Sequence, residues 1–315
     1  MILVAGSANL DFVVRANHIP SPGETVLGRD FKTFPGGKGA NQAVACARAG
    51  GAVTHMVLAL GDDAFAVPLE ASLNEAHVHL HIVRVAEQPT GTAFICVSDD
   101  AENAITVAPG ANQCLQAGHL PALNGFSHLL MQLETPLETV MAYADSARKQ
   151  GVTVVLNAAP AQALSQALLD LVDVLVVNEG ELATVAGRVG TIAQCLEAIH
   201  IPTVVVTLGH HGCLARSHGS LYLQTAFDIT PVDTTGAGDT FCGTLVASLS
   251  QGASMAQALR AASAAGALAC TRPGAQSSIP HTAEVGVFLD QQPAPLPDPL
   301  NELRAFCGLP RSSLA

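Results

Sequence analysis

Short apolar runs alternate with helical patterns along most of the chain. The runs are apolar at consecutive positions, which is typical of strands buried on both faces. Strands are predicted at residues 2–6, 53–59, 128–133, 152–156, 174–177 and 204–207. Helices are predicted between them, at residues 38–49, 63–74, 136–150, 163–169 and 192–199. This alternation predicts an α/β fold, with a doubly wound, mostly parallel sheet flanked by helices.

Two segments, at about residues 11–35 and 91–108, do not follow this alternation. Both hold short β-prone pieces separated by turn residues, and 92–97 with 103–107 is typical of a hairpin. They are predicted to form a small sheet that stands off the main domain as a lid over a ligand, with ordinary surface hairpins as the alternative. After residue 204, two short strands (212–216 and 221–225) and two long helices (238–250 and 254–271) are predicted.

A single α/β domain is therefore predicted over residues 1–290. The Pro-rich tail, 291–315, is expected to be extended or disordered and unnecessary for chemistry. Hydrophobic residues make up 49% of the 315 residues and charged residues 13%, as in a globular protein with a large apolar interior. The net charge of −12 argues against nucleic acid or an anionic membrane as a partner. Eight Cys without a Cys-x-x-Cys pair, and no basic leader, favour a soluble cytoplasmic protein with reduced thiols.

The most informative motif is residues 233–240, Asp-Thr-Thr-Gly-Ala-Gly-Asp-Thr, which runs into an apolar helical segment. The free N–H groups of a helix start and a Gly-rich turn can hold an anion. Asp239 would lie beside that anion and could take a proton from an alcohol. An anion hole next to a base is what phosphoryl transfer to a hydroxyl requires. The alternative is a plain helix cap, because Asp and Thr are good N-caps.

A second Gly-rich motif and several strand ends support the kinase interpretation. Residues 35–42, Pro-Gly-Gly-Lys-Gly-Ala-Asn-Gln, open another helix and combine backbone donors with Lys38 and Asn41. Polar residues follow predicted strands at the edge where open α/β sheets bind ligands, namely Asn9, Asp11, Glu134, Asn178, Glu181 and Thr207. Each taken alone is also typical of a turn or a cap. His77, His79 and His81 have a spacing that could bind a metal, but an exposed face of an edge strand is the preferred interpretation.

With both motifs in this order, the chain resembles the ribokinase-like (PfkB) carbohydrate kinases over about nine-tenths of its length. The resemblance implies that Asp239 is the catalytic base and that the amides of Gly236, Ala237 and Gly238 form the anion hole. It implies a sugar site of Asn9, Asp11, Gly37, Lys38, Asn41, Glu134 and Asp239. It implies a nucleotide site of Asn178, Thr207, Gly209, Gly212 and Gly238. It implies that Glu181 holds Mg²⁺ through water, and that K⁺ is bound by Asp233, Thr235, Ala269, Arg272, Gly274 and Ser278.

The expected reaction is ATP-dependent phosphorylation of D-ribose at O5, with Mg²⁺ and K⁺ and with a homodimer formed through the lid. Another sugar or nucleoside of the same family (2-deoxyribose, fructose or adenosine) is the alternative, and His210 and His211 are unusual in the nucleotide loop. The chain could also be a sugar- or nucleotide-binding module without turnover. The retained Asp239 argues against it, because a binder has no need of a base.

Overall fold

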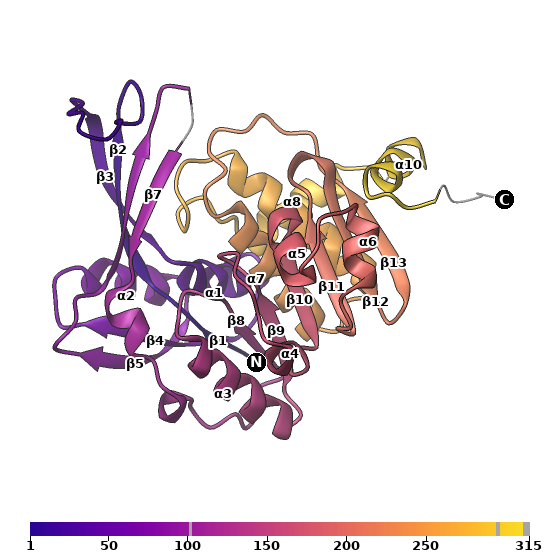
Figure 1. Ribbon diagram of the computed structural model, residues 1–315, viewed down its shortest axis with the longest axis horizontal. Coiled ribbons are helices and arrows are strands. Elements are labelled where there is room, and N and C mark those ends of the chain that lie inside the picture. The colour runs from indigo at the N-terminus through magenta and orange to yellow at the C-terminus, as the bar shows by residue number, and fades with distance from the viewer. Residues whose placement is uncertain (101–102, 294–296, 311–315) are drawn as a thin grey trace.

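The computed structural model describes residues 1–100, 103–293 and 297–310. Its largest feature is a nine-stranded sheet (Figure 1). The strands are β1 (Ile2–Ala5), β4 (Thr54–Gly61), β5 (His79–Val85), β8 (His128–Met131), β9 (Thr153–Asn157), β10 (Val174–Asn178), β11 (Thr203–Thr207), β12 (Gly212–Ser217) and β13 (Ser220–Thr225). Their order is β13-β12-β11-β10-β9-β8-β1-β4-β5, parallel from β5 to β11 with β12 and β13 antiparallel at one edge. The predicted doubly wound, mostly parallel sheet is confirmed.

Helices cover both faces of this sheet, because strands that are apolar at consecutive positions leave no face for water. One face is covered by α1 (Lys38–Arg48), α2 (Ala66–Glu75), α7 (Ala237–Ser250), α8 (Met255–Cys270) and α9 (Thr282–Asp290). The other is covered by α3 (Leu137–Lys149), α4 (Gln166–Leu169), α5 (Glu179–Ala186), α6 (Ile192–Glu197) and the 3-10 helix η1 (Gly110–Cys114). Two further 3-10 helices are η2 (Ala117–His119) and η3 (Gly209–His211). In the described part of the chain, no helix combines the length and apolarity needed to cross a membrane.

A separate four-stranded sheet, the lid, projects from the main domain (Figure 1). It is built from β2 (Asn9–Arg15), β3 (Arg29–Gly36), β6 (Gly91–Val97) and β7 (Asn103–Ala108), in the order β3-β2-β6-β7. The parallel pairing of β2 with β6 joins the two predicted lid segments into one sheet. The prediction of a second small sheet is therefore confirmed.

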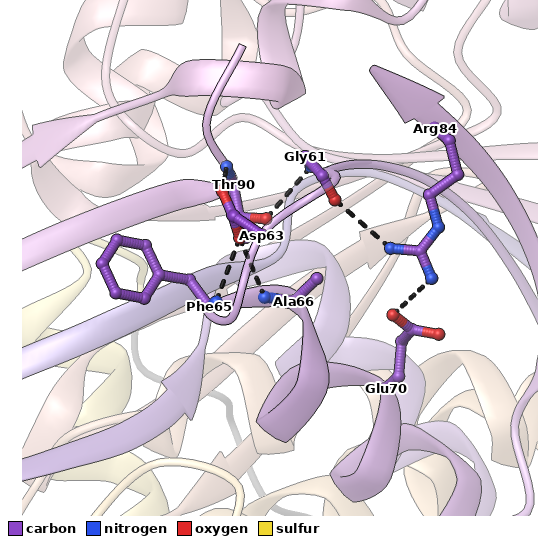
Figure 2. Close-up of polar contacts among 7 residues, drawn as sticks. All are labelled: Gly61, Asp63, Phe65, Ala66, Glu70, Arg84 and Thr90. Carbon is purple, nitrogen blue, oxygen red and sulfur yellow. Dashed lines mark hydrogen bonds and ion pairs between the residues drawn. The ribbon is translucent and has the colours of Figure 1, made fainter. Parts of the chain in front are cut away.

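One carboxylate ties the lid to the main domain where β6 begins. Asp63, which follows β4, accepts the amide of Thr90 at 2.7 Å (Figure 2). It also accepts the amides of Phe65 and Ala66 at the start of α2, at 3.0 and 3.2 Å. The Thr90 hydroxyl in turn accepts the amide of Gly61 at 3.0 Å. These bonds fix the point at which the chain enters the lid.

The prediction of an extended or disordered tail is wrong for part of it. The chain forms α10 (Pro297–Phe306), and Leu303 and Cys307 are buried in the core beside α6. Proline is tolerated in the first turn of a helix, where its missing N–H would have no partner, so Pro297 and Pro299 do not prevent this helix. Residues 294–296 and 311–315 of the tail lie outside the described residues.

The histidines at 79 and 81 lie on β5, the edge strand of the main sheet, while His77 lies in the turn before it. The His55 ring on β4 contacts both strand histidines, with ring centroids 4.6 Å from His79 and 5.4 Å from His81. The cluster lies where β4 and β5 begin. It is therefore at the opposite end of the sheet from the glycine-rich motifs.

Candidate active site

A cavity lies at the carboxyl ends of β9, β10 and β11, between the two glycine-rich motifs. Its lining residues are Lys38, Asn157, Ala159, Val176, Val177, Asn178, Glu181, Thr207, Gly236, Gly238 and Asp239. Most of these residues were predicted as site residues from their positions in the two motifs or at strand ends. The structure brings them together because the carboxyl ends of parallel strands meet at one edge of the sheet.

Asp239 lies in the first turn of α7 and is buried. Its Oδ2 accepts from Nδ2 of Asn41, and its Oδ1 accepts from Nε2 of Gln42, both at 2.9 Å. A Cβ atom at Gly243 would lie 2.5 Å from the Gln42 carbonyl oxygen and 2.6 Å from Cβ of Ala45. Because Gly243 has no side chain, α7 packs close enough to α1 for two α1 side chains to hold this carboxylate.

The glycines of the first motif lie directly on the chain between β1 and β2. Gly37 has a φ of +89°, and a Cβ there would lie 2.6 Å from the backbone nitrogen of Asn9. A Cβ at Gly39 would lie 2.6 Å from the carbonyl carbon of Gly6. This contact fixes the start of α1 against the root of the lid.

Glu134, which follows β8, is held from two sides. It accepts the backbone amide of Lys38 at 3.1 Å and the hydroxyl of Ser7 at 2.5 Å.

The Lys38 ammonium faces three carboxylates. Asp239 makes the largest contribution to raising the pKa of Lys38, and Glu134 and Glu181 add to it against the lowering effect of burial. Lys38 therefore stays cationic beside the candidate base.

Asp11 lies on β2 with its carboxylate against the first motif, since a Cβ at Gly36 would lie 2.2 Å from its Oδ2. Burial, followed by the negative charges of Glu134 and Asp239, raises the pKa of Asp11 to about 7. Desolvation and like charges both disfavour the ionised carboxylate. Asp11 therefore titrates near neutral pH.

Asn9, at the start of β2, is fixed by a residue to which the sequence analysis gave no role. Asn112 is buried and donates from Nδ2 to Oδ1 of Asn9 at 2.8 Å, while its own Oδ1 accepts the amide of Ala8 at 3.0 Å. The carbonyl oxygen of the Asn9 side chain is thereby occupied. Its amide nitrogen remains the group that a ligand can engage.

Asn178 and Glu181 cap α5 and also line the cavity. The Asn178 side chain accepts the amide of Glu181 at 2.9 Å, and Glu181 accepts the amide of Asn178 at 2.8 Å. The two roles weighed for Asn178 from the sequence, cap and site residue, are therefore compatible. Burial raises the pKa of Glu181, with Asp239 adding to it against the Asn178 amide and Lys38.

The second motif forms the start of α7. Gly236 has a left-handed φ of +73°, and a Cβ at Gly238 would meet no atom within 4 Å. Within the described residues, the amides of Gly236 and Gly238 donate to no protein group, whereas the Ala237 amide donates to the Thr234 carbonyl at 3.2 Å. Two of the three predicted anion-hole amides are therefore free to bind an anion.

The segment predicted to bind K⁺ surrounds Asp233. Its Oδ1 accepts the amide and hydroxyl of Thr235 at 2.9 and 2.6 Å, and its Oδ2 accepts the amide of Gly274 at 2.8 Å. Burial works to raise the pKa of Asp233, but these bonds outweigh it and the pKa is lowered. The other predicted members lie on this segment or at the end of α8. The Arg272 side chain pairs with Glu284, so it points to α9.

Thr207, at the end of β11, lines the cavity, but Gly209 and Gly212 do not belong to its lining. A Cβ at Gly212 would lie 2.1 Å from the Gln224 carbonyl oxygen, which gives this glycine a packing reason of its own. The His211 ring stacks on Phe306 of α10 with ring centroids 3.9 Å apart, and it contacts the tilted His210 ring at 4.0 Å. A nucleotide role for the two glycines stays a prediction.

The sequence analysis gave no role to several buried polar residues near Asp239. Gln42 belongs to the first glycine-rich motif, Gln132 lies within the predicted strand 128–133, and Asn157 ends β9. A polar residue inside or directly after an apolar run was the available signal. The same signal identified Asn9 and Glu134, and it applied equally to Gln132 and Asn157.

Comparison with known proteins identifies the family. A model of the pfkB family carbohydrate kinases matches residues 1–282. The chain is 38% identical over 301 residues to a ribokinase of Haemophilus influenzae, covering 92% of this chain and 98% of the relative. It is 32% identical over 301 residues to a deoxyribokinase of Salmonella typhi, covering 91% and 98%. A solved structure of Arabidopsis thaliana ribokinase with ribose and ATP superposes with a TM-score of 0.85 at 31% identity, covering 92% of this chain and 99% of that one.

Proposed function

The chain belongs to the pfkB family of carbohydrate kinases, and we propose that it transfers the γ-phosphoryl group of ATP to O5 of D-ribose. The observation that carries this proposal is Asp239, a buried carboxylate next to two free amides and the Lys38 ammonium, within reach of the sugar residues at the lid root. The ribokinase relatives, and the Arabidopsis structure with ribose and ATP, support the choice of substrates.

The proposed reaction follows from this geometry. Asp239 takes the proton of the 5-hydroxyl, and the oxygen attacks the γ-phosphorus. The bond from that phosphorus to the bridging oxygen breaks, and ADP leaves with the electron pair. The free amides of Gly236 and Gly238 stabilise the charge on the transferred group. Lys38 adds a fixed positive charge at the same place.

The sugar would be bound by Asn9, Asp11, Gly37, Lys38, Asn41 and Glu134. Asn9, Asp11 and Asn41 are buried polar residues, so a sugar that lacks a hydroxyl would leave one of them without a partner. This favours ribose over 2-deoxyribose, although a deoxyribokinase is also among the relatives. Fructose and adenosine are further candidate acceptors.

Both predicted metal ions fit the residues present. Glu181 is a buried carboxylate at the cavity whose pKa is raised by burial, and a nearby cation would offset that burial. We assign it, with Asn178, to Mg²⁺ and its waters at the ATP phosphates, where the ion neutralises charge. Asp233 and the backbone carbonyls around it supply the hard oxygen ligands that suit K⁺. Replacing K⁺ by Na⁺ should lower the rate, and equal rates in the two salts would reject the K⁺ site.

The lid is proposed to pair with the lid of a second copy. Phe31 and Phe94 are each more than half exposed on it, at 63% and 55%, and both rings stack on Phe12. Apolar side chains gathered in this way are typical of an interface. Sedimentation should show a dimer that Phe94→Asp weakens, and a monomeric wild type would reject this proposal.

The experiment that tests the function is ADP release from Mg-ATP in K⁺ buffer, with ribose, 2-deoxyribose, fructose and adenosine compared side by side. Ribose is expected to give by far the highest kcat/KM. Preference for another acceptor would keep the mechanism and reassign the sugar. No turnover with any of them would favour a binding role.

A further inference from the structure

A row of buried side-chain amides extends from Asp239 into the core. Nε2 of Gln42 donates to Oδ1 of Asp239 and to Oδ1 of Asn157, both at 2.9 Å. Oε1 of Gln42 accepts from Nε2 of Gln132 at 2.6 Å. Gln42 and Gln132 are fully buried, and the three amides come from α1, β9 and the end of β8.

The groups at the two ends of this row, the Asp239 carboxylate and the Val176 carbonyl, determine the orientation of each amide. A carboxylate only accepts, so Gln42 must turn its nitrogen to Asp239 and its oxygen to Gln132, which must then donate. Asn157 donates from Nδ2 to the Val176 carbonyl at 3.0 Å, and this carbonyl also only accepts. Asn157 therefore presents its oxygen to Gln42, and the two ends agree on one orientation for Gln42.

This orientation has a cost. Oε1 of Gln132 is buried and has no hydrogen-bond partner within the described residues. Leaving a buried acceptor unpaired costs about 1–3 kcal/mol. Gln132 therefore donates its nitrogen to Gln42 although its own oxygen stays unpaired among the described residues.

We propose that Gln42 is a positioning residue for Asp239, and that Gln132 and Asn157 fix the amide of Gln42. This inference rests on the proposed function of Asp239 as the base. Gln42 donates to Oδ1 of Asp239, and Asn41 donates to Oδ2. Because each carboxylate oxygen has one donor, the two donors together determine the plane of the carboxylate. The remaining lone pairs are then aimed at one place, where the sugar hydroxyl would lie. Proton transfer depends steeply on such geometry.

The test is Gln42→Leu, which keeps similar bulk and removes the donor. We expect kcat to fall roughly 10–100-fold, the scale of a misplaced catalytic group, with the KM values for sugar and ATP changed less than about threefold. The matched control is Gln224→Leu on β13, another buried glutamine, whose Nε2 donates to the Thr225 carbonyl. This control should leave kcat unchanged. A kcat for Gln42→Leu within about twofold of wild type, or a loss confined to KM, would overturn the proposal.

A double-mutant cycle separates positioning from general stability. Gln132→Leu alone should lower kcat by a smaller factor, and it should add nothing in the Gln42→Leu background, because it acts through Gln42. Independent, additive losses would overturn the proposed row. If Gln42→Leu does not fold, the kcat of the Gln132→Leu variant tests the proposal by itself. A wild-type kcat for Gln132→Leu would then overturn the proposal.

A crystal structure gives a readout that does not depend on turnover. In Gln42→Leu the Asp239 carboxylate should rotate away from its wild-type position, and an unchanged carboxylate would overturn the proposal. The kinetic test uses whichever sugar turns over in the wild type. Failure of ribose as a substrate would therefore reject the proposed sugar without touching the role of Gln42.

Discussion

The two glycine-rich motifs of the site have similar sequences, but their glycines are needed for different reasons. In the first motif, a Cβ at Gly37 or Gly39 would lie 2.6 Å from backbone atoms of the chain between β1 and β2. In the second, a Cβ at Gly238 would meet nothing within 4 Å. The space at Gly39 is filled by the protein itself, whereas the space at Gly238 is open to a ligand.

This difference separates the two tasks of the site. The first motif is a packing element that holds Lys38 and Glu134 at the lid root. The second is a surface of free amides at the start of α7, with Asp239 beside them. Substitutions of the packed glycines in the first motif should therefore act mainly on stability, and substitutions in the second motif mainly on turnover.

The largest effect is expected at the carboxylate that the second motif presents. Asp239→Asn should lower kcat by roughly 10²–10⁴-fold, the usual contribution of a general base, with ribose binding measured by calorimetry largely retained. Asp170→Asn, at an exposed acid at the end of α4, is the control and should have no effect. Wild-type turnover in Asp239→Asn would remove the base from the mechanism and with it the distinction between the motifs.

A stability loss of intermediate size is expected for Gly39→Ala. The added methyl group would meet backbone atoms of Gly6 and Ser7 that cannot move independently, and overpacking of this kind costs about 1–3 kcal/mol. The free energy of unfolding, measured with urea, should fall by that amount. Gly286→Ala on α9, where a Cβ meets no atom within 4 Å, should cause no loss. Equal stabilities of the two variants would contradict the packing role of the first motif.

The order of elements and most of the cavity residues could be predicted from the sequence. Consecutive apolar positions identify the buried strands, and strand ends of a parallel sheet share one edge, so Asn178 and Thr207 had to converge. The relatives support the fold independently. Pairing between distant side chains was not predictable in this way. Gln42 reaches Gln132 and Asn157 across 90 and 115 residues of chain, and a single sequence carries no signal for such partners.

The tail was mispredicted for a related reason. Proline content was taken as a property of the whole segment, although its effect depends on position within a helix. Pro297 and Pro299 fall in the first turn of α10, where they do no harm, and the burial of Leu303 provides the stabilising contact. Composition alone could not show that this helix packs against β13 and α6.

A smaller effect, with opposite signs for stability and activity, is expected for Gly238→Ala. Alanine in place of a helical glycine that has room for a methyl group stabilises by about 0.4–1 kcal/mol. The same methyl group would project into the space where the transferred phosphoryl group is proposed to lie, so kcat/KM for ATP should fall, roughly tenfold or more. Urea unfolding and steady-state kinetics on one preparation measure both. Unchanged kcat/KM would show that the open space is not used by the nucleotide.

A further effect concerns pH and the first motif, against which Asp11 packs. The pKa of Asp11 is raised from 3.8 to about 7 in the folded state, so between these values the folded protein keeps a proton that the unfolded chain has released. The contribution of Asp11 to the free energy of unfolding should therefore fall as pH rises from about 4 to about 7, and then level off. Asp11→Asn removes this titration but leaves Glu134, Glu181 and the other carboxyls in place. The difference in unfolding free energy between variant and wild type should therefore grow in favour of the variant across that range. If the unfolding free energies of Asp11→Asn and wild type change in parallel with pH, then Asp11 is not held in a protonated state in the folded protein. The surroundings of Asp11 at the first motif would then be more hydrated than the close packing indicates.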